Sequence, residues 1–429
     1  MTTPSTPSTI HNVRLFDGER LVSESGAIRL AGGVVTALGA AVHTEPGDTV
    51  IDGAGGTVLP GLIDSHVHLL PGSPAQALSF GVTTILDMFS KQPLISRSLT
   101  DGSLVGRAGV LTSGVGASAP GGHPSMMYAP FPTVSTPAEA ASFVADRRAE
   151  GAAYLKLMYE GGQQLGWAMP SLDLPTVRAL VRAAHDAGLP VVAHIHAAVD
   201  AVAMADCGVD VLAHVPIDPL SAEQRQALAA ARIAVISTLS VADGLTGDRV
   251  PLLERPALAA RLGPAWTGVL QAQTRRWRPP QLPSFDDAMA NVAALHRAGV
   301  RVLAGTDAPN PGTVTGASLH RELELLVDAG LSAPDALAAA TGAAGHCFPL
   351  GGRGRLAVGA PADVLLVSGR PDARITDSAN VTGIWKAGVP QPLDDYVGSA
   401  DETAGIDFLR GQTQRVIDAV RQRFPGFTG

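Results

Sequence analysis

The middle of the chain repeats one unit, a short apolar run followed by a turn and, in several cases, a helical stretch such as 174–187, which ends at Gly188. Eight runs of this kind occur. Alternating strands and helices form parallel sheets with right-handed crossovers, so eight repeats favour an α/β fold of the (β/α)8 TIM barrel type. The expected strands are the run ending at His66, then 82–88, 109–113, 154–158, 190–196, 209–214, 233–238 and 300–307.

The two ends of the chain differ from this middle. Residues 10–60 alternate short β-like runs with turns, and the same pattern of strands and turns begins again near residue 355. We therefore expect one small sheet domain built from both ends. The final segment has helical character and either packs on the barrel or mediates contact in a homo-oligomer. The predicted division is a disordered tail at 1–9, a small β-sandwich domain at 10–60 and 355–395, a barrel at 61–354 and a C-terminal helical extension at 396–429.

Composition excludes several classes of protein. Hydrophobic residues make up 46% of the 429 residues and charged residues 16%, which suits buried parallel strands. The net charge of −8, without a basic stripe, argues against nucleic-acid binding, and no apolar stretch reaches the roughly 18 residues that a membrane span needs. Two cysteines and a start without a signal-peptide pattern indicate a cytoplasmic protein. The partner that we expect is a small-molecule substrate.

Polar side chains stand where the expected strands end. His66 and His68 are two residues apart, so on a strand they project from the same face. In a (β/α)8 barrel the carboxyl ends of all strands meet at one mouth, where such groups would converge. Neutral imidazole suits zinc, nickel, cobalt or manganese, with zinc the default. The predicted metal ligands are His66, His68, Lys156, His194, His214 and Asp307.

Two of these positions have alternatives. Asp307 follows Gly-Thr, so it is either a helix N-cap or a carboxylate beside the metal that moves a proton as general base and acid. His194 and His196 share one strand and one face. The spacing to His214 favours His194 as the ligand and leaves His196 facing substrate, but the reverse assignment stays open.

Four motifs together resemble the amidohydrolase superfamily. VLPGLIDSHVH at 58–68 resembles its first barrel strand and GVTT at 81–84 its second. GTDA at 305–308 resembles its eighth strand, and GAPADVLLV at 359–367 is similar to the strand that re-enters the small sheet. The resemblance spans roughly residues 10–390 and is specific at the level of the family.

The resemblance also implies ligand roles. Lys156 resembles the strand-four lysine that carbon dioxide carboxylates at N6 so that it bridges two divalent ions. An unpaired ammonium between Leu155 and Leu157 would be costly to bury, and a salt bridge to a carboxylate is the other solution. His194 and His214 look like the strand-five and strand-six ligands of the imidazolonepropionase-like and prolidase-like branch.

Three further residues are expected near substrate. GGH at 121–123 resembles a loop of the same branch, in which the histidine, here His123, lies near the substrate. His196 and Tyr159 would donate hydrogen bonds to a developing oxyanion, although loop hydrogen bonding of His123 and rim packing of Tyr159 are the competing interpretations. Tyr159-Glu160 also departs from the small residues that usually follow the strand-four lysine.

The predicted function is hydrolysis of an amide or peptide-like C–N bond, of dipeptide or N-acyl amino acid type, by a metal-bridging hydroxide. A lactone or ester hydrolase would use the same site. A ring deaminase would lack the strand-four lysine and place a glutamate soon after the strand-five histidine, and an inactive barrel would lack a ligand. An apolar acyl or aromatic pocket is suggested by Met126, Met127, Tyr128, Phe131, Trp167, Trp266 and Trp277.

Overall fold

The computed structural model describes residues 6–100, 105–166, 168–246, 249–276 and 284–423. Each of the eight apolar runs of the middle segment contains a strand, and neighbouring strands pair in parallel in two sheets. The first sheet holds β6 (Leu62–Val67), β7 (Val82–Asp87) and β8 (Gly109–Thr112), and the second holds β9 (Leu155–Met158), β10 (Val191–His194), β11 (Val211–Ala213), β12 (Ala234–Ile236) and β13 (Arg301–Leu303).

Backbone contacts join the two sheets at both of their edges. Ala117, beyond β8, bridges Leu157 of β9, and Val67 of β6 bridges Ala308, beyond β13. The predicted α/β class with parallel strands is confirmed. Contacts along both seams are the arrangement that a (β/α)8 barrel requires, because closure leaves no free sheet edge.

Helices follow most of the strands and begin where the sequence provides caps. In α5 (Leu174–Asp186), Asp173 accepts a hydrogen bond from the amide of Thr176 at 2.8 Å, and Gly188 ends the helix with a φ of 73°. The other helices around the strands are α1 (Ser73–Ser79), α2 (Leu94–Thr100), α3 (Ser125–Tyr128), α4 (Ala140–Ala149), α6 (Ala198–Asp206), α7 (Ala222–Ala231), α8 (Leu239–Thr246), α10 (Phe285–Arg297), α11 (Ala317–Asp328) and α12 (Ala333–Ala339).

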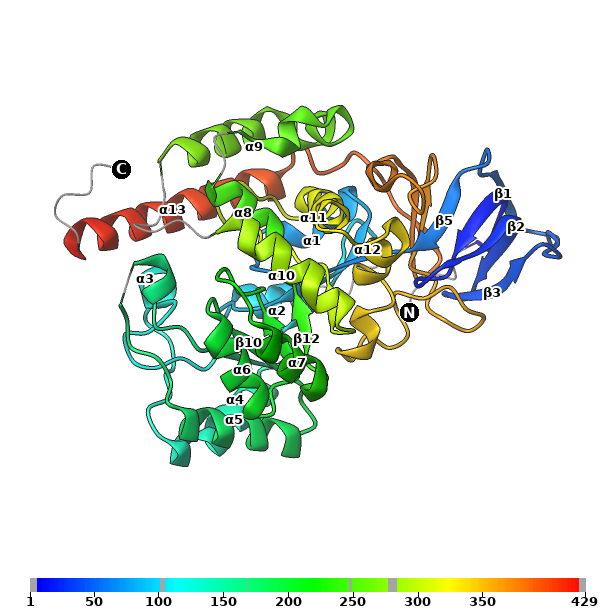
Figure 1. The fold of residues 1–429 in the computed structure, drawn as a ribbon. Coiled ribbons are helices and arrows are strands. Elements are labelled where there is room, and N and C mark those ends of the chain that lie inside the picture. The colour runs from blue at the N-terminus through cyan, green and yellow to red at the C-terminus, as the bar shows by residue number, and fades with distance from the viewer. Residues whose placement is uncertain (1–5, 101–104, 167, 247–248, 277–283, 424–429) are drawn as a thin grey trace.

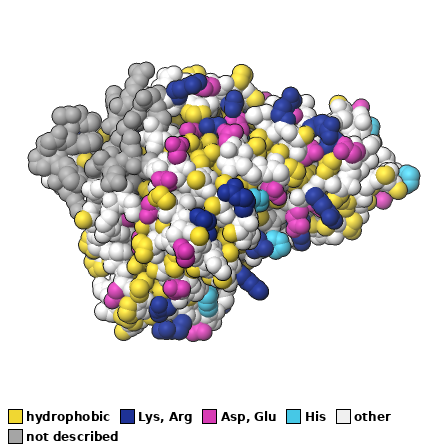
Figure 2. Space-filling view, in the orientation of Figure 1, with side chains coloured by type: hydrophobic (Ala, Val, Ile, Leu, Met, Phe, Trp, Pro, Cys, Tyr) yellow, Lys and Arg dark blue, Asp and Glu magenta, His cyan; other side chains and the backbone are white. Residues whose placement is uncertain are grey.

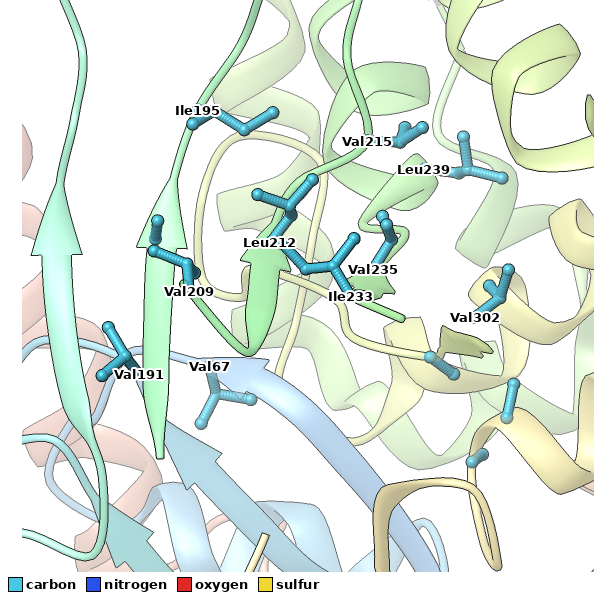
Figure 3. Close-up of a cluster of buried hydrophobic side chains, with 14 of the residues drawn as sticks. Val67, Val191, Ile195, Val209, Leu212, Val215, Ile233, Val235, Leu239 and Val302 are labelled. Atoms are coloured by element: carbon cyan, nitrogen blue, oxygen red, sulfur yellow. The ribbon is translucent and has the colours of Figure 1, made fainter. Parts of the chain in front are cut away.

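Side chains of the parallel strands alternate between two apolar clusters. Leu212, Val235 and Val302 belong to the large cluster shared with the surrounding helices (Figure 3). Their neighbours Ile236 and Leu303 belong to a separate cluster on the opposite face of the same strands. This period of two fixes which residues of each strand face the interior and which face the helices.

Strands from both chain ends form one eight-stranded sheet, which lies at one end of the molecule (Figure 1). Within it β14 pairs antiparallel with β5, with Leu365 opposite Leu59. β1 begins at Ser8, so residues 8 and 9 lie in the sheet and not in the tail that we expected. The two-layer sandwich stays a prediction. The strands are β1 (Ser8–Phe16), β2 (Leu21–Ala31), β3 (Val34–Gly39), β4 (Thr49–Asp52), β5 (Thr57–Pro60), β14 (Val364–Val367), β15 (Val381–Lys386) and β16 (Val389–Pro390).

Two long helices, α9 (Pro256–Arg276) and α13 (Ala400–Arg423), contact each other at the end of the molecule away from the terminal sheet (Figure 1). α9 is broken at Gly263, whose φ is 68°. Ile406 and Leu409 of α13 are buried in one apolar cluster with Leu262 and Trp266 of α9. The C-terminal extension therefore packs on the body of the protein, which is one of the two arrangements that the sequence left open.

The surface is mixed in charge. On the face that Figure 2 shows, basic and acidic side chains are interspersed among hydrophobic ones. None of the described helices is both long enough and apolar enough to cross a membrane.

The outer cluster yields a stability prediction. Leu212 is fully buried between β11 and the helices, so Leu212→Ala removes packed apolar volume and should lower the free energy of unfolding by about 2–5 kcal/mol. Denaturant titration measures this. Val199→Ala, at a position 65% exposed on α6, is the control and should change stability by less than about 0.5 kcal/mol. Equal effects of the two substitutions would contradict the assignment of the core.

Candidate metal centre

One cavity gathers eight of the nine residues that the sequence singled out. It has a volume of about 190 Å³ and lies at the carboxyl ends of the parallel strands. Residues that are up to 241 positions apart in sequence meet there, as the barrel prediction requires. The predicted residues that line it are His66, His68, His123, Lys156, His194, His196, His214 and Asp307.

The first group of potential ligands surrounds Asp307. Its Oδ1 lies 3.2 Å from Nε2 of His66 and 3.0 Å from Nε2 of His68, so both histidines of the HVH motif point at the same carboxylate. The ring of His214 lies 4.8 Å from that of His66, and ligand atoms of His66, His214 and Asp307 fall within 4.8 Å of one another. Such a trio can hold one cation.

A second group lies beside the first. Nδ1 of His194 is 3.0 Å from Nε2 of His214, which links the two groups. Glu160 places Oε2 2.5 Å from Nδ1 of His196 and 3.6 Å from Nε2 of His194. Glu160, His194 and His196 also have ligand atoms within 4.8 Å of one another. His194 thus contacts both His214 and His196, so it is the member of its strand that joins the two groups.

His123 forms one wall of the second group. Its ring stacks on that of His194 with a centroid distance of 4.6 Å and an interplanar angle of 22°. Burial lowers the pKa of His123 to about 4, so the ring is neutral at pH 7. The predicted proximity of His123 to the ligand cluster is what the structure shows; its role toward substrate stays a prediction.

Lys156 is the most unusual group in the cavity. Its side chain is 1% exposed, and its Nζ has no hydrogen-bond partner among the described residues. Burial lowers the pKa of Lys156 to about 7, against the opposing pull of Asp307. Near neutral pH a large fraction of this amine is therefore unprotonated, which is the form that reacts with carbon dioxide.

Burial also decides the protonation of three more imidazoles, whereas at His68 the hydrogen bond and charge of Asp307 outweigh burial and raise the pKa. Burial lowers the pKa of His66 to about 4 and holds the pKa values of His194 and His214 well below the usual range. Burial would raise the pKa of Asp307, but the nearby His66 and hydrogen bonds from His66 and His68 outweigh it and hold that pKa well below its usual value. Neutral His66, His194 and His214 beside an ionised Asp307 are in the protonation states that metal binding needs.

Two strand-end residues have left-handed backbone conformations. His214 has a φ of 84° and Asp307 a φ of 54°, conformations that cost non-glycine residues energy and that cluster at functional sites. Asp64 stabilises this region, since it accepts hydrogen bonds from the amides of His66 and Thr306 and from the Thr306 hydroxyl at 2.7 Å. At Gly305 a Cβ would meet the His66 nitrogen at 2.9 Å, so only glycine fits beside the ligand strand.

Tyr159 is the predicted site residue that the structure places elsewhere. It packs, half-buried, against the outer apolar cluster and does not line the cavity. The reason is strand alternation, because Lys156, Met158 and Glu160 share the inner face and Tyr159 lies on the other. Glu160 is the residue that the sequence analysis missed. The same alternation, continued from Lys156 for two steps, would have found it.

The expected apolar pocket is present in part. Met126, Met127 and Tyr128 line the cavity. Phe131 packs on Phe89 with a ring distance of 5.2 Å, and Trp266 is buried in the cluster under α13, so neither lines it. The remaining two, Trp167 and Trp277, lie outside the described residues.

The model of the amidohydrolase family matches residues 57–392. The chain therefore belongs to the amidohydrolase family. The prediction that it is an enzyme hydrolysing carbon–nitrogen bonds is confirmed at this level. A dihydroorotase from Geobacillus sp. (strain WCH70) is 35% identical over 95 residues, and this match spans about a fifth of each protein, 20% of the chain and 22% of the dihydroorotase.

Solved structures share the fold over nearly their whole length. A candidate prolidase from Bifidobacterium longum superposes with a TM-score of 0.74 and 25% identity, covering 96% of this chain and 100% of that one. A Xaa-Pro dipeptidase with bound methionine superposes with a TM-score of 0.72 and 21% identity, covering 90% of this chain and 99% of that one. The ochratoxinase of A. niger superposes with a TM-score of 0.68 and 20% identity, covering 90% of this chain and 96% of that one.

The close approach at Gly305 yields a prediction. Gly305→Ala should displace His66 and weaken zinc binding by about tenfold or more, because shifts in groups that support a ligand typically cost 10- to 100-fold. Competition with a chelator measures the affinity. Gly411→Ala is the matched control, since its added Cβ would meet nothing nearer than 4.0 Å. Unchanged zinc affinity in a folded Gly305→Ala protein would contradict the described packing.

Proposed function

We propose that this protein is a metal-dependent hydrolase that cleaves the amide bond of an N-acyl amino acid or a dipeptide. One observation carries the proposal: the buried amine of Lys156, which has no hydrogen-bond partner among the described residues, lies in one cavity with six histidines and Asp307. A buried lysine with a purely structural role is expected to pair with a carboxylate, as Lys386 does with Asp363 at 3.6 Å.

The donor set fits two divalent cations. Buried atoms without a hydrogen-bond partner among the described residues include Nζ of Lys156 and Nε2 of His194, which are positions that ions would satisfy. His66, His68 and Asp307 would hold one ion, with His194 and His214 holding the other. N6-carboxylated Lys156 would bridge them. Zinc is the default, with manganese, cobalt and nickel as further candidates.

Bound divalent cations supply an activated hydroxide and polarise the scissile carbonyl. Asp307, whose pKa is held well below its usual value, is ionised and can accept the proton of the attacking water. It then returns that proton to the amine as the C–N bond breaks, so no proton is lost in the cycle.

The other side chains of the cavity orient the substrate. His196 is bound through Nδ1 by Glu160, which leaves Nε2 as the ring nitrogen that can reach a substrate oxygen. Burial would raise the pKa of Glu160, but His196 and His194 outweigh it and lower that pKa, so the carboxylate stays ionised. The names of the similar structures, a prolidase and a Xaa-Pro dipeptidase, support amide-type substrates.

A substrate panel tests the reaction. Protein loaded with zinc or manganese in bicarbonate should hydrolyse members of a set of N-acyl amino acids and dipeptides. Metal analysis should find close to two ions per chain. If the protein hydrolyses lactones and none of the amides, the proposed cleavage of a C–N bond is wrong and the reaction is cleavage of a C–O bond. A protein that binds no metal would contradict the mechanism.

Lys156→Ala tests the bridge. The variant should bind fewer than two ions and lose about 100-fold or more in kcat/KM, because even groups outside the ligand set are worth 10- to 100-fold. Lys386→Ala is the control for loss of a buried lysine, since Lys386 lies in the terminal sheet. It should keep two ions even if its melting temperature falls. Full activity of Lys156→Ala would contradict the bridge.

A further inference from the structure

A second, larger cavity adjoins the candidate metal centre. It has a volume of about 670 Å³ and lies between α9 and α13, the two helices side by side in Figure 1. The groove is lined by Ala265, Gly268 and Val269 of α9 and by Val416 and Ile417 of α13. It is several times larger than the 190 Å³ cavity that holds the ligand cluster.

The two cavities are continuous, since several residues line both. Val416 of α13 lines the small cavity together with His66 and Lys156, and it also lines the groove. A substrate whose amide lies at the ligand cluster therefore has direct access to the groove. The residues common to both linings are His68, Met127, Tyr128, Asn310, Pro311 and Val416.

The groove offers little to a charged group. Arg410 is the one arginine among the described lining residues, and no lysine or carboxylate lines it there. Its side chain is 68% exposed and lies 3.5 Å from Asp407 of the same helix, so it is already partnered at the rim. A charge in the groove would lose hydration without an ion-pair partner, whereas burial of apolar surface there is favourable.

Packing between α9 and α13 fixes one end of the groove. Ile406 and Leu409, in the first half of α13, are buried with Leu262 and Trp266 of α9, whereas Val416 and Ile417 are only half-buried. The N-terminal half of α13 is thus anchored, and Val416 and Ile417, farther along the helix, line the groove. Residues that would be core in a closed helix pair remain available to a ligand.

We propose that the groove between α9 and α13 binds an extended apolar arm of the amide substrate, so that the enzyme prefers substrates with a long alkyl or aryl substituent. This inference rests on the proposed amide hydrolysis at the adjoining cluster. It assigns the C-terminal helix a direct role in substrate selection.

Two substrate series test the preference. One is N-acyl-L-alanine with acetyl, butyryl, hexanoyl and octanoyl chains, and the other is acetamides of n-alkylamines from ethyl to octyl. In at least one series kcat/KM should rise about tenfold or more from the shortest to the longest member, since each added CH2 enters apolar surroundings. Constant kcat/KM along both series overturns the inference while leaving the proposed reaction in place.

Variants connect the preference to the groove. Ala265→Trp fills it and should lower kcat/KM for the longest substrate of the responsive series about tenfold, leaving the shortest within twofold. Ile417→Ala should act in the same direction. Ala260→Trp, at an exposed position of α9 that does not line the groove, is the matched control and should change neither. Equal loss for short and long substrates, or no loss for either, overturns the assignment.

Two further readouts separate the inference from its rivals. Calorimetric binding of N-octanoyl- against N-acetyl-L-alanine to zinc-loaded protein reports on the groove even if no amide is hydrolysed, and equal affinity counts against it. An N-acyl-L-alanine whose acyl chain ends in a carboxylate should react more slowly than the N-octanoyl substrate. Faster reaction would mean that Arg410 recognises an anion. A change in molar mass with Ala265→Trp in light scattering would mean that a second copy occupies the groove. Either of the last two results overturns the apolar arm.

Discussion

Burial of histidine and lysine nitrogens around one ionised carboxylate is the constraint on which the rest of the site depends. Low dielectric surroundings disfavour the charged forms of His66, His194, His214 and Lys156, so their lone pairs stay free. These four side chains would not be packed this closely if each were a cation, since their positive charges would repel. The parallel sheets stabilise the arrangement because these side chains stand at or just beyond strand ends whose other residues are fixed in two apolar clusters.

Much of the fold could be predicted from the sequence because strand and helix periodicities are strong in buried α/β proteins. All eight apolar runs contain strands, and the segment after Asp401 forms α13. Sequence patterns could not say how the ends of the chain pack, because docking depends on complementary shapes between distant surfaces. For this reason the position of α13 beside α9, over the ligand cluster, emerged only from the structure.

The candidate site could likewise be predicted from the sequence only in part. His66, His68 and Asp307 could be predicted because short motifs place them at strand ends, and the parallel strands bring such ends together at one edge. Tyr159 was misplaced and Glu160 missed because residues after the fourth strand were judged by chemical type rather than by the alternation that begins at Lys156. The contact between Glu160 and His196 joins two strands, and a pattern along one strand carries no information about it.

The amidohydrolase family gives the chemistry, and the particular residues around the cavity give this member its character. Glu160 contributes an ionised carboxylate to one wall of the cavity, and α13 lines an apolar groove that adjoins the other wall. The most direct measurement of the central claim is anomalous diffraction at the zinc edge from crystals of the zinc-loaded protein. The account predicts two peaks about 3.5–4 Å apart, with added density on Lys156 between them. A single peak with an unmodified Lys156, or zinc bound elsewhere, would contradict it.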